Sequence, residues 1–319
     1  MDDIAAGGGA VAFHSRAAQE AVLDIPALVD WMEEAHRLGA PETTDSLIGP
    51  QGGRLFVRSA VLPGVAMGAK VVSICPGNPL RGLPSVQAVF VLLDGASGAP
   101  RAMLDATGLT YWKTAADSAL GARHLARPDA RSLLMVGAGD LAPWLVRAHL
   151  AVRPGIAEVK IWNRTAPRAA NLAASLASQG IAATAAVDLE GAVRGADIIS
   201  TATMTRQPLI RGEWLKAGAH LDLVGAYEPE TREADDDCIR RARLFTDFRP
   251  SAADVGEFLL PTASGAMRAG DLLGDLYDLA RGAPGRLAAS DITLFKNAGG
   301  GHLDLMTAQF LLHRLAAKA

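Results

Sequence analysis

The stretch at residues 132–142, SLLMVGAGDLA, constrains the fold most strongly, because it runs from an apolar strand-like segment through glycines into a helix-like segment. Beyond residue 130, strand-like and helix-like patterns alternate. The apolar runs lie at 132–136, 158–162, 198–202 and 220–224, and helical patterns lie from about 140 and through 171–178. This alternation predicts an α/β fold with a doubly wound parallel sheet of the Rossmann class.

The glycine turn is expected to bind a dinucleotide. Gly137 permits the tight turn, and Gly139 lets backbone N–H groups approach a pyrophosphate at the positive end of the helix. Ala142 stands where a small residue lets the helix pack against the strand. The predicted contacts with the cofactor in this turn are Gly137, Ala138, Gly139, Asp140 and Leu141.

The next strand ends in WNRT, residues 162–165, where an enzyme that uses NAD usually places an acid for the ribose 2′-hydroxyl. Arg164 can pair with a 2′-phosphate through its planar guanidinium, while Asn163 and Thr165 hydrogen-bond to it. The sequence therefore favours NADP(H), with NAD(H) possible. The alternative for this segment is a solvated helix N-terminus.

Two later strand ends complete the expected cofactor cleft. The fourth strand ends in TATMT, from which Thr201, Ala202 and Thr203 are predicted to line the cleft, and the fifth ends at Val224 and Gly225. Small side chains at these positions leave room for a ligand at the carboxyl ends of the strands.

The first part of the chain has a different pattern. Helical spacing at 26–38 is followed by strand-like runs at 55–61, 67–74 and 86–93 with turn-rich connections, which indicates an antiparallel or mixed sheet. A helical pattern covers 108–125, and a last strand at 292–296 precedes a helix at 303–315 that could return to the first domain. We therefore expect a discontinuous α+β substrate-binding and dimerisation domain, 1–112 with 303–319, and a Rossmann domain, 113–302.

Three basic residues mark a possible substrate site. Arg58 and Lys70 lie within core-directed strand patterns, where a charge is costly unless a partner or a ligand anion meets it. Lys113 and Thr114 are expected to begin a helix whose N–H groups face an anion. Together they indicate a carboxylate site. The alternatives are side chains that point to solvent from alternating strands, and, for Lys113, a salt bridge to a neighbouring acid.

Composition narrows the class of protein. The net charge of −3 gives no basic field for nucleic acid or an anionic membrane, and no apolar run reaches membrane-spanning length. Cys75 and Cys238 form no disulfide framework, and no histidine spacing indicates a metal site. The first ten residues do not resemble a signal peptide. We expect a cytoplasmic enzyme with a small-molecule substrate.

The sequence resembles the ornithine cyclodeaminase and mu-crystallin family. The matching pieces include FVRSAVLPG, GAKVVSICPGNPLRGLPSVQAVFVLLDGASGAP, KTAADSALGARHLAR, VGAGDLA, GADIISTAT, AHLDLVGAYEPETREAD and TLFKNAGGGHLDL, from about residue 55 to 308. The resemblance implies a homodimer built through the first domain and an active site between the domains for an amino or imino acid. It places Arg58, Lys70 and Lys113 around that substrate, although the family more often has arginine at the position of Lys113. It also places the KNAGGG loop near the nicotinamide, with Asn297 either as a contact or as a turn residue.

The residue at one position distinguishes the cyclodeaminases of this family from its reductases. Cyclodeaminases have a catalytic aspartate shortly after the fifth strand, where this chain has Tyr227, and Asp222 is not a positional match. A tyrosine of ordinary pKa cannot replace a carboxylate base at neutral pH. We therefore expect NADPH-dependent reduction of Δ1-pyrroline-2-carboxylate to L-proline, and of Δ1-piperideine-2-carboxylate to L-pipecolate, with Lys70 polarising or protonating the imine. Ornithine cyclodeaminase, an amino acid dehydrogenase and a non-catalytic mu-crystallin-like binding protein remain alternatives.

Overall fold

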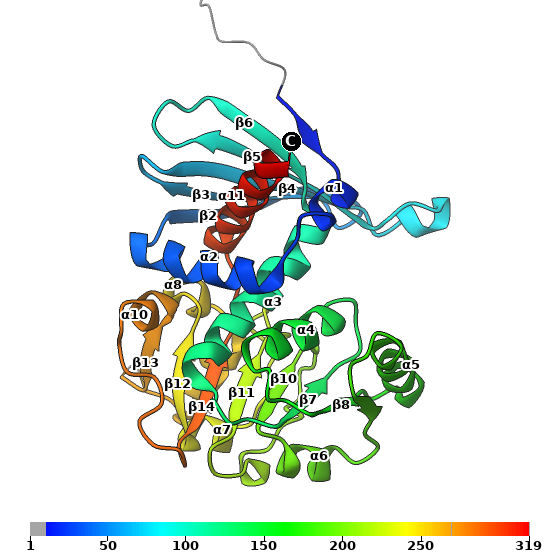
Figure 1. The fold of residues 1–319 in the computed structure, drawn as a ribbon, viewed down its shortest axis with the longest axis vertical. Helices are drawn as coiled ribbons and strands as arrows, with labels where there is room; N and C mark the ends of the chain where they lie inside the picture. Colours follow the sequence, from blue (N-terminus) through cyan, green and yellow to red (C-terminus); the bar gives the residue numbers. More distant parts are fainter. Residues whose placement is uncertain (1–10, 269, 319) are drawn as a thin grey trace, which may run out of the picture. The chain divides into compact units, whose positions relative to one another are not determined.

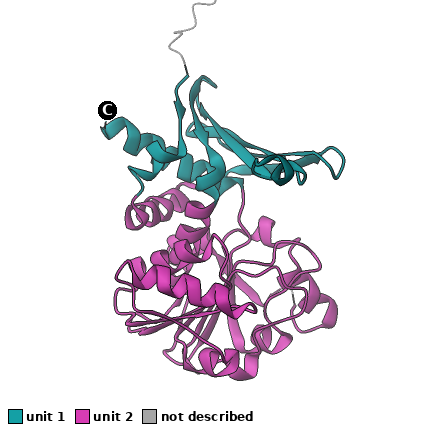
Figure 2. Ribbon diagram, turned by 90° about the vertical axis from the view of Figure 1, so that its right-hand side faces the viewer, with its two compact units in different colours: residues 1–23, 40–110, 301–319 teal, residues 24–39, 111–300 magenta. Residues whose placement is uncertain are grey.

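The computed structural model describes residues 11–268 and 270–318, which form two compact units (Figure 2). Unit 1 contains the described residues up to Leu23, Ala40–Thr110 and the described residues from Gly301 onward, and unit 2 contains Asp24–Gly39 and Tyr111–Gly300. Residues 1–10, on which the expectation about a signal peptide rested, lie outside the described part.

Unit 1 is built on a mixed sheet, as the sequence predicted, and Figure 1 labels its strands from β2 to β6. Its described strands lie in the order β1-β6-β5-β4-β3-β2, antiparallel except for the parallel pair β1 and β6. The strands are β1 (Phe13–His14), β2 (Glu42–Ile48), β3 (Arg54–Leu62), β4 (Ala66–Ile74), β5 (Val86–Asp94) and β6 (Pro100–Asp105). The helices are α1 (Arg16–Glu20), η1 (Asn78–Arg81) and α11 (Gly301–Lys318), and α11 packs on β2, β3, β4 and β5.

The register of this sheet aligns charged side chains. Asp45 of β2 pairs with Arg58 of β3, which pairs with Lys70 of β4, which pairs with Phe90 of β5. Directly opposite residues in antiparallel strands point to the same face. The register therefore places one acid and two bases in a single row across the sheet.

Unit 2 contains a fully parallel sheet, which confirms the Rossmann prediction. The described strands follow the order β13-β12-β14-β11-β10-β7-β8-β9. They are β7 (Ser132–Val136), β8 (Glu158–Trp162), β9 (Ala183–Ala185), β10 (Ile198–Thr201), β11 (His220–Leu223), β12 (Ala242–Thr246), β13 (Leu272–Asp275) and β14 (Ile292–Lys296). Their side chains form a buried aliphatic core that includes Leu134, Ile199, Leu221 and Leu294.

Except for α2, which precedes β2 in the chain, the helices of unit 2 follow or connect the strands of its sheet (Figure 1). They are α2 (Ile25–Leu38), α4 (Ala142–Val152), α5 (Ala166–Ala177), α6 (Leu189–Gly195), η2 (Gly212–Trp214), α7 (Asp236–Arg241), α8 (Arg249–Ala252), α9 (Gly256–Ser264) and α10 (Leu276–Ala280), and α3 (Ala106–Leu125) leads into the unit. None of the helices in the described part of the chain has the length and apolarity needed to cross a membrane.

The division of the chain differs from the expected one at α2. The expected division placed residues 24–39 in the first domain, whereas the structure groups them with unit 2. The cause is packing, because α2 lies against α4 and α10. Its buried side chains include Leu28, Val29 and Met32.

The strand order of unit 2 reverses between β7 and β10. From β7 the chain proceeds through β8 to β9 on one side, and it then crosses to β10 and β11 on the other. Ligands of doubly wound sheets bind at the carboxyl ends of the strands at such a reversal. The predicted glycine turn follows β7 at this point.

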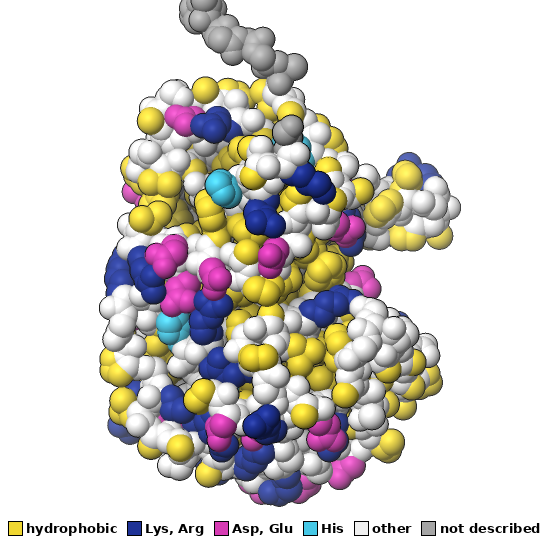
Figure 3. Space-filling view, viewed as in Figure 1, with side chains coloured by type: hydrophobic (Ala, Val, Ile, Leu, Met, Phe, Trp, Pro, Cys, Tyr) yellow, Lys and Arg dark blue, Asp and Glu magenta, His cyan; other side chains and the backbone are white. Residues whose placement is uncertain are grey.

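On the face shown in Figure 3, basic and acidic side chains are interspersed over the surface.

Candidate cofactor and substrate sites

The turn after β7 has the geometry that a dinucleotide requires. Gly137 has a φ of +112°, and a Cβ there would lie 2.6 Å from the carbonyl oxygen of Ala202. A Cβ on Gly139 would meet no atom within 4 Å, so this side of the turn is open. Ala142 is fully buried in the first turn of α4, as its small size predicted. The turn therefore fits a pyrophosphate held by backbone N–H groups.

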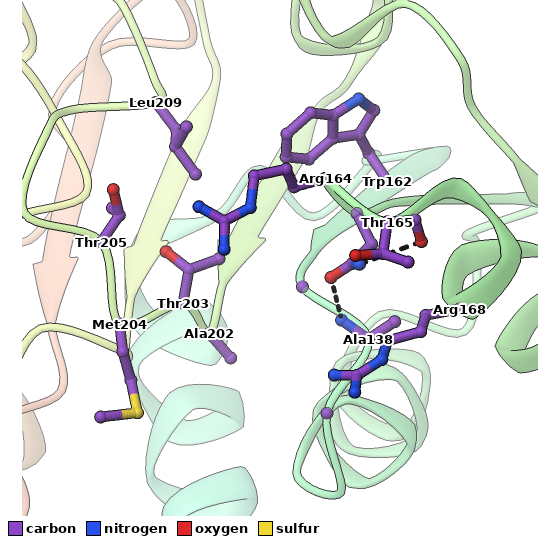
Figure 4. A pocket seen from close by; sticks show the side chains of 13 residues that line it. Ala138, Trp162, Arg164, Thr165, Arg168, Ala202, Thr203, Met204, Thr205 and Leu209 are labelled. Carbon is purple, nitrogen blue, oxygen red and sulfur yellow. Dashed lines mark hydrogen bonds between the residues drawn. The ribbon is translucent and has the colours of Figure 1, made fainter.

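A cavity of about 320 Å³ opens beside this turn (Figure 4). One wall follows β10 and consists of Ala202, Thr203, Met204, Thr205 and Leu209, which we call the 202–209 wall. The opposite side consists of the glycine turn with Trp162, Asn163, Arg164, Thr165 and Arg168. In Figure 4 the Arg164 side chain extends across the cavity toward Thr203. The structure thus brings together residues that the sequence predicted from three separate strand ends.

Arg168 is a cavity residue that sequence reasoning missed. It lies in the first turns of α5 and also lines an adjoining cavity with Ala138, Gly139 and Asp140. Helical spacing could not have found it, since Arg164 precedes Thr165, the residue that caps α5, and only Arg168 belongs to the helix. The cavity therefore has two guanidinium groups rather than one.

Asn163 is already hydrogen-bonded within the protein. Its Oδ1 accepts the N–H of Ala138 at 3.2 Å, and its Nδ2 donates to the carbonyl of Thr165 at 3.1 Å. These bonds join the glycine turn to the end of β8. Of the other predicted cofactor residues, Leu141 directly precedes α4, and the carbonyl of Thr201 accepts the N–H of Val224 at 2.9 Å.

In unit 1, Lys70 forms a buried ion pair. Its Nζ lies 2.8 Å from Oδ2 of Asp304, and both side chains are almost inaccessible to solvent. Asp304 belongs to the first turn of α11. The buried carboxylate compensates the charge of the buried ammonium.

Arg58 lies beside this pair in the row across the sheet. Its Nε donates to Oδ1 of Asp45 at 2.9 Å, and its Nη2 donates to Oδ2 of Asp45 at 2.5 Å. Gly301 lies close to it, since a Cβ on this glycine would approach Arg58 Cγ to 3.2 Å. Arg58 and Lys70 are therefore neighbouring cations, as the carboxylate-site hypothesis requires.

The expected position of Lys113 at a helix start is wrong. The helix α3 already begins at Ala106, after the Asp105 side chain accepts the N–H of Thr107 at 2.8 Å. The N–H groups of Lys113 and Thr114 therefore belong to the helix interior and are not available to an anion. Both side chains are buried, so a direct contact through the lysine ammonium stays a proposal.

Lys113 lies in a group of buried charges. Burial raises the pKa of Asp117, one helical turn later; the nearby Asp247 adds to this, whereas Lys113 opposes it. Oδ2 of Asp247 accepts the N–H of Gly299 at 2.6 Å, and a Cβ on Gly299 would lie 2.9 Å from Lys113 Nζ. Asp117 lies within the KTAADSALGARHLAR piece but carried no prediction of its own, and Asp247 lies outside the quoted motifs.

Asn297 fixes the KNAGGG loop to α3. Its Nδ2 donates to the carbonyl of Thr114 and to Oγ of Ser118, both at 3.0 Å. Ser118 in turn donates to Oδ1 of Asp222 at 2.9 Å, while Ser200 donates to Oδ2 at 2.7 Å. The amide of Asn297 thus belongs to a buried hydrogen-bond network.

The two residues considered for a cyclodeaminase base have unsuitable surroundings. Burial acts to raise the pKa of Asp222, but hydrogen bonds from His149 and Ser200 outweigh it and lower this pKa below its usual value. Partial burial and the neighbouring Glu228 raise the pKa of Tyr227, whose side chain is largely exposed. Neither group therefore has the pKa of a base poised near neutrality.

Comparisons with known proteins identify the family of the chain. The model of the ornithine cyclodeaminase/mu-crystallin family matches residues 26–319. The Delta(1)-pyrroline-2-carboxylate reductase of Paracoccus denitrificans is 46% identical over 290 residues, which are 90% of this chain and 92% of that protein. The ketimine reductase mu-crystallin of Rattus norvegicus is 34% identical, over 77% of this chain and 75% of its own.

A solved structure is similar over nearly the whole chain. The Thermococcus litoralis Delta(1)-pyrroline-2-carboxylate reductase in complex with NADH and L-proline superposes with a TM-score of 0.88 at 27% identity, covering 97% of this chain and 98% of that one. The resemblance first seen in separate motifs therefore extends through both units. The chain belongs to the ornithine cyclodeaminase/mu-crystallin family.

Proposed function

We propose that the protein reduces Δ1-pyrroline-2-carboxylate to L-proline, and the six-membered Δ1-piperideine-2-carboxylate to L-pipecolate, with NADPH. The observation that carries the reductase assignment is Tyr227, an exposed phenol of raised pKa at the position where cyclodeaminases have a carboxylate. Support also comes from the relatives named as reductases of the five-membered imine. When bound, the nicotinamide supplies the hydride that reduces the C=N bond.

The preference for NADPH is inferred from the cavity of unit 2. Arg164, Arg168 and Thr165 gather there, and the end of β8 lacks the acid that would bind a ribose 2′-hydroxyl. Guanidinium groups bind phosphate oxygens through paired, charge-assisted hydrogen bonds. The proposed contacts are therefore a 2′-phosphate at Arg164 and Arg168, and a pyrophosphate at the glycine turn.

We assign the binding of the substrate to the basic residues that the sequence predicted. We propose that Arg58 binds its carboxylate, a contact for which Lys113 and Thr114 are further candidates. Lys70 donates a proton to the imine nitrogen, because a protonated iminium accepts hydride far better than the neutral imine. Asp304 compensates the charge of Lys70 and holds its Nζ in place, at an N–O distance of 2.8 Å.

We further propose a homodimer formed through unit 1. Apolar side chains are exposed on its sheet, among them Leu47, Ile48, Leu55 and Val86. Apolar surface of this kind commonly marks a protein interface. Light scattering of the purified protein measures the mass directly.

Cys75 and Cys238 are both free thiols, which agrees with a proposed location in the reducing cytoplasm.

The cofactor assignment is tested by Arg168→Gln. We expect the KM for NADPH to rise about ten- to hundredfold, because one charge-assisted contact with the 2′-phosphate is lost, while the KM for NADH stays within about twofold. Arg240→Gln serves as the matched control, since its side chain is 55% exposed on α7 and does not line the cavity. Equal changes for NADPH and NADH would place Arg168 away from the 2′-phosphate.

A further inference from the structure

The 202–209 wall is held at both ends by one buried residue, Glu233. Its Oε1 accepts the N–H of Thr203 at 2.7 Å and the hydroxyl of Thr203 at 2.6 Å. Its backbone carbonyl accepts the N–H of Leu209 at 2.9 Å and that of Ile210 at 3.0 Å. A single residue outside the cavity lining thus fixes the first and last parts of the wall.

The other oxygen of Glu233 connects this wall to β11. Oε2 accepts the N–H of Gly225 at 2.7 Å. The two segments are in close contact, since a Cβ on Gly225 would lie 1.9 Å from the carbonyl oxygen of Thr203. The Glu233 carboxylate therefore holds together the ends of two neighbouring strands, β10 and β11.

A second buried carboxylate holds the first. Glu257 lies in the first turn of α9, and its Oε2 and Oε1 accept the N–H groups of Glu233 at 2.8 Å and Ala234 at 3.0 Å. Glu233 and Glu257 are both fully inaccessible to solvent. Each oxygen of Glu257 faces a backbone donor, an arrangement that favours the ionised carboxylate, because protonation weakens one oxygen as an acceptor and adds an O–H that needs an acceptor of its own.

We propose that Glu233 and Glu257 are positioning residues that fix the 202–209 wall, so that cofactor affinity depends on the ionisation of Glu257, a carboxyl group outside the cofactor cavity. This proposal rests on the proposed cofactor cavity but not on the identity of the substrate. Protonation of Glu257 weakens one of its two acceptor oxygens and adds an O–H donor, so that Glu233 is held less firmly and the wall loosens.

The surroundings of Glu257 place its protonation near neutral pH. Burial raises its pKa to about 7; the charge of Lys296 on β14 opposes this, and that of Glu233 adds to it. The thiol of Cys238 on α7 also faces it. Because the ionised form holds the wall, cofactor affinity should rise as the pH rises through about 7.

The first test is titration of the cofactor-free protein with NADH at several pH values, in which nicotinamide fluorescence reports binding. NADH is the probe because it lacks the 2′-phosphate, which titrates in the same range. We expect its Kd to fall about tenfold from acidic to alkaline pH, which corresponds to one hydrogen bond to a charged group. Glu257→Gln resembles the protonated form, so it should bind weakly with a flat pH profile. Glu213→Gln, exposed on η2, should keep the wild-type profile.

The second test needs neither cofactor nor activity. Backbone amide exchange of Thr203 and Gly225 should show protection that decreases below about pH 7 in the wild type and is low throughout in Glu257→Gln. If the variant does not fold, the pH dependence of the wild-type Kd and protection still decides the matter. A pH-independent Kd with constant protection would overturn the proposal. A wild-type protein that binds no NADH at any pH would instead refute the proposed cofactor cavity.

Discussion

Lys70 is the side chain on which the proposed chemistry depends most. Its replacement by alanine should lower kcat about 10²- to 10⁴-fold, because the imine loses its positioned acid, while the Kd for NADPH stays unchanged. Steady-state reduction of the cyclic imine measures kcat, and titration of the protein with NADPH, monitored by nicotinamide fluorescence, measures the Kd. Lys70 is paired with the buried Asp304. A variant that removes the lysine leaves the Asp304 carboxylate buried without this cation, so the protein also loses stability.

Two further variants separate chemistry from stability at this position. Lys70→Arg keeps the positive charge beside Asp304 but is a far weaker proton donor, so it should retain the melting temperature and still lose most of kcat. Lys318→Ala removes an exposed lysine from the end of α11 and should change neither. Turnover of Lys70→Arg at the wild-type rate would exclude proton donation by Lys70.

If Arg58 binds the substrate carboxylate, as we propose, Asp45 competes with the substrate for this guanidinium. Its carboxylate occupies the guanidinium of Arg58, which we assign to the substrate carboxylate. Asp45→Asn should therefore lower the KM for the imine about two- to fivefold at unchanged kcat, since a partly exposed ion pair contributes up to about 1 kcal/mol. A raised KM would show instead that Asp45 orients Arg58 for binding.

At the scale of elements, the two glycines of the β7–α4 turn should respond differently to alanine. Gly137→Ala forces a side chain into a positive φ and against the carbonyl of Ala202, so both the melting temperature and NADPH affinity should fall. Gly139→Ala meets no protein atom, so the melting temperature should stay constant while NADPH affinity falls. Unchanged NADPH affinity in Gly139→Ala would contradict a pyrophosphate at this turn.

The sequence predicted best the elements whose apolar residues are continuous. The strands at 132–136, 158–162 and 292–296 were predicted with the bounds that the structure shows. The first and the last are buried along nearly their whole length, as parallel strands covered on both faces are, whereas the strand at 158–162 buries only Val159 and Ile161. The strand β2 (Glu42–Ile48) was missed, since every residue of it is exposed and no apolar alternation marks it. The sequence therefore reports burial more directly than it reports strand pairing.

The site was predictable only where a motif coincides with a strand end. The glycine turn, Arg164 and Thr203 were found in this way, and all of them line one cavity. Glu233 was not found, because its contacts with Thr203 and Gly225 depend on how three loops fold against one another. Such contacts between distant segments leave no periodic signal in the chain.

At the scale of the whole molecule, buried histidines predict acid sensitivity. Burial lowers the pKa of His36 to about 4, from an ordinary value of 6.5, although Nδ1 donates to the carbonyl of Met32. The unfolded chain then binds a proton that the folded chain does not, so stability is present above about pH 6.5 and is lost as the pH falls toward 4. Between about pH 7 and 5 the loss is about 2 kcal/mol, measured as a fall in melting temperature of about 3 to 6 °C.

A variant of His36 separates its effect on the pH dependence of stability from that of groups with the opposite effect. Glu257, with its raised pKa, stabilises the fold as the pH falls, so only a difference between proteins assigns the effect. His36→Phe keeps a ring against Tyr277, which lies 4.5 Å away between centroids, and should show a shallower loss on acidification. His313→Phe, at an exposed position, is the control. Equal slopes for His36→Phe and the wild type would show that His36 does not titrate in this way.

The most direct measurement of the proposed function compares two reactions of the wild-type protein. One follows consumption of NADPH, beside NADH, with Δ1-pyrroline-2-carboxylate and identifies the product; the other follows ammonia release from ornithine with NAD. We predict rapid, NADPH-preferring formation of L-proline from the imine and no ammonia from ornithine. Release of ammonia and proline from ornithine, without reduction of the imine, would contradict the reductase assignment.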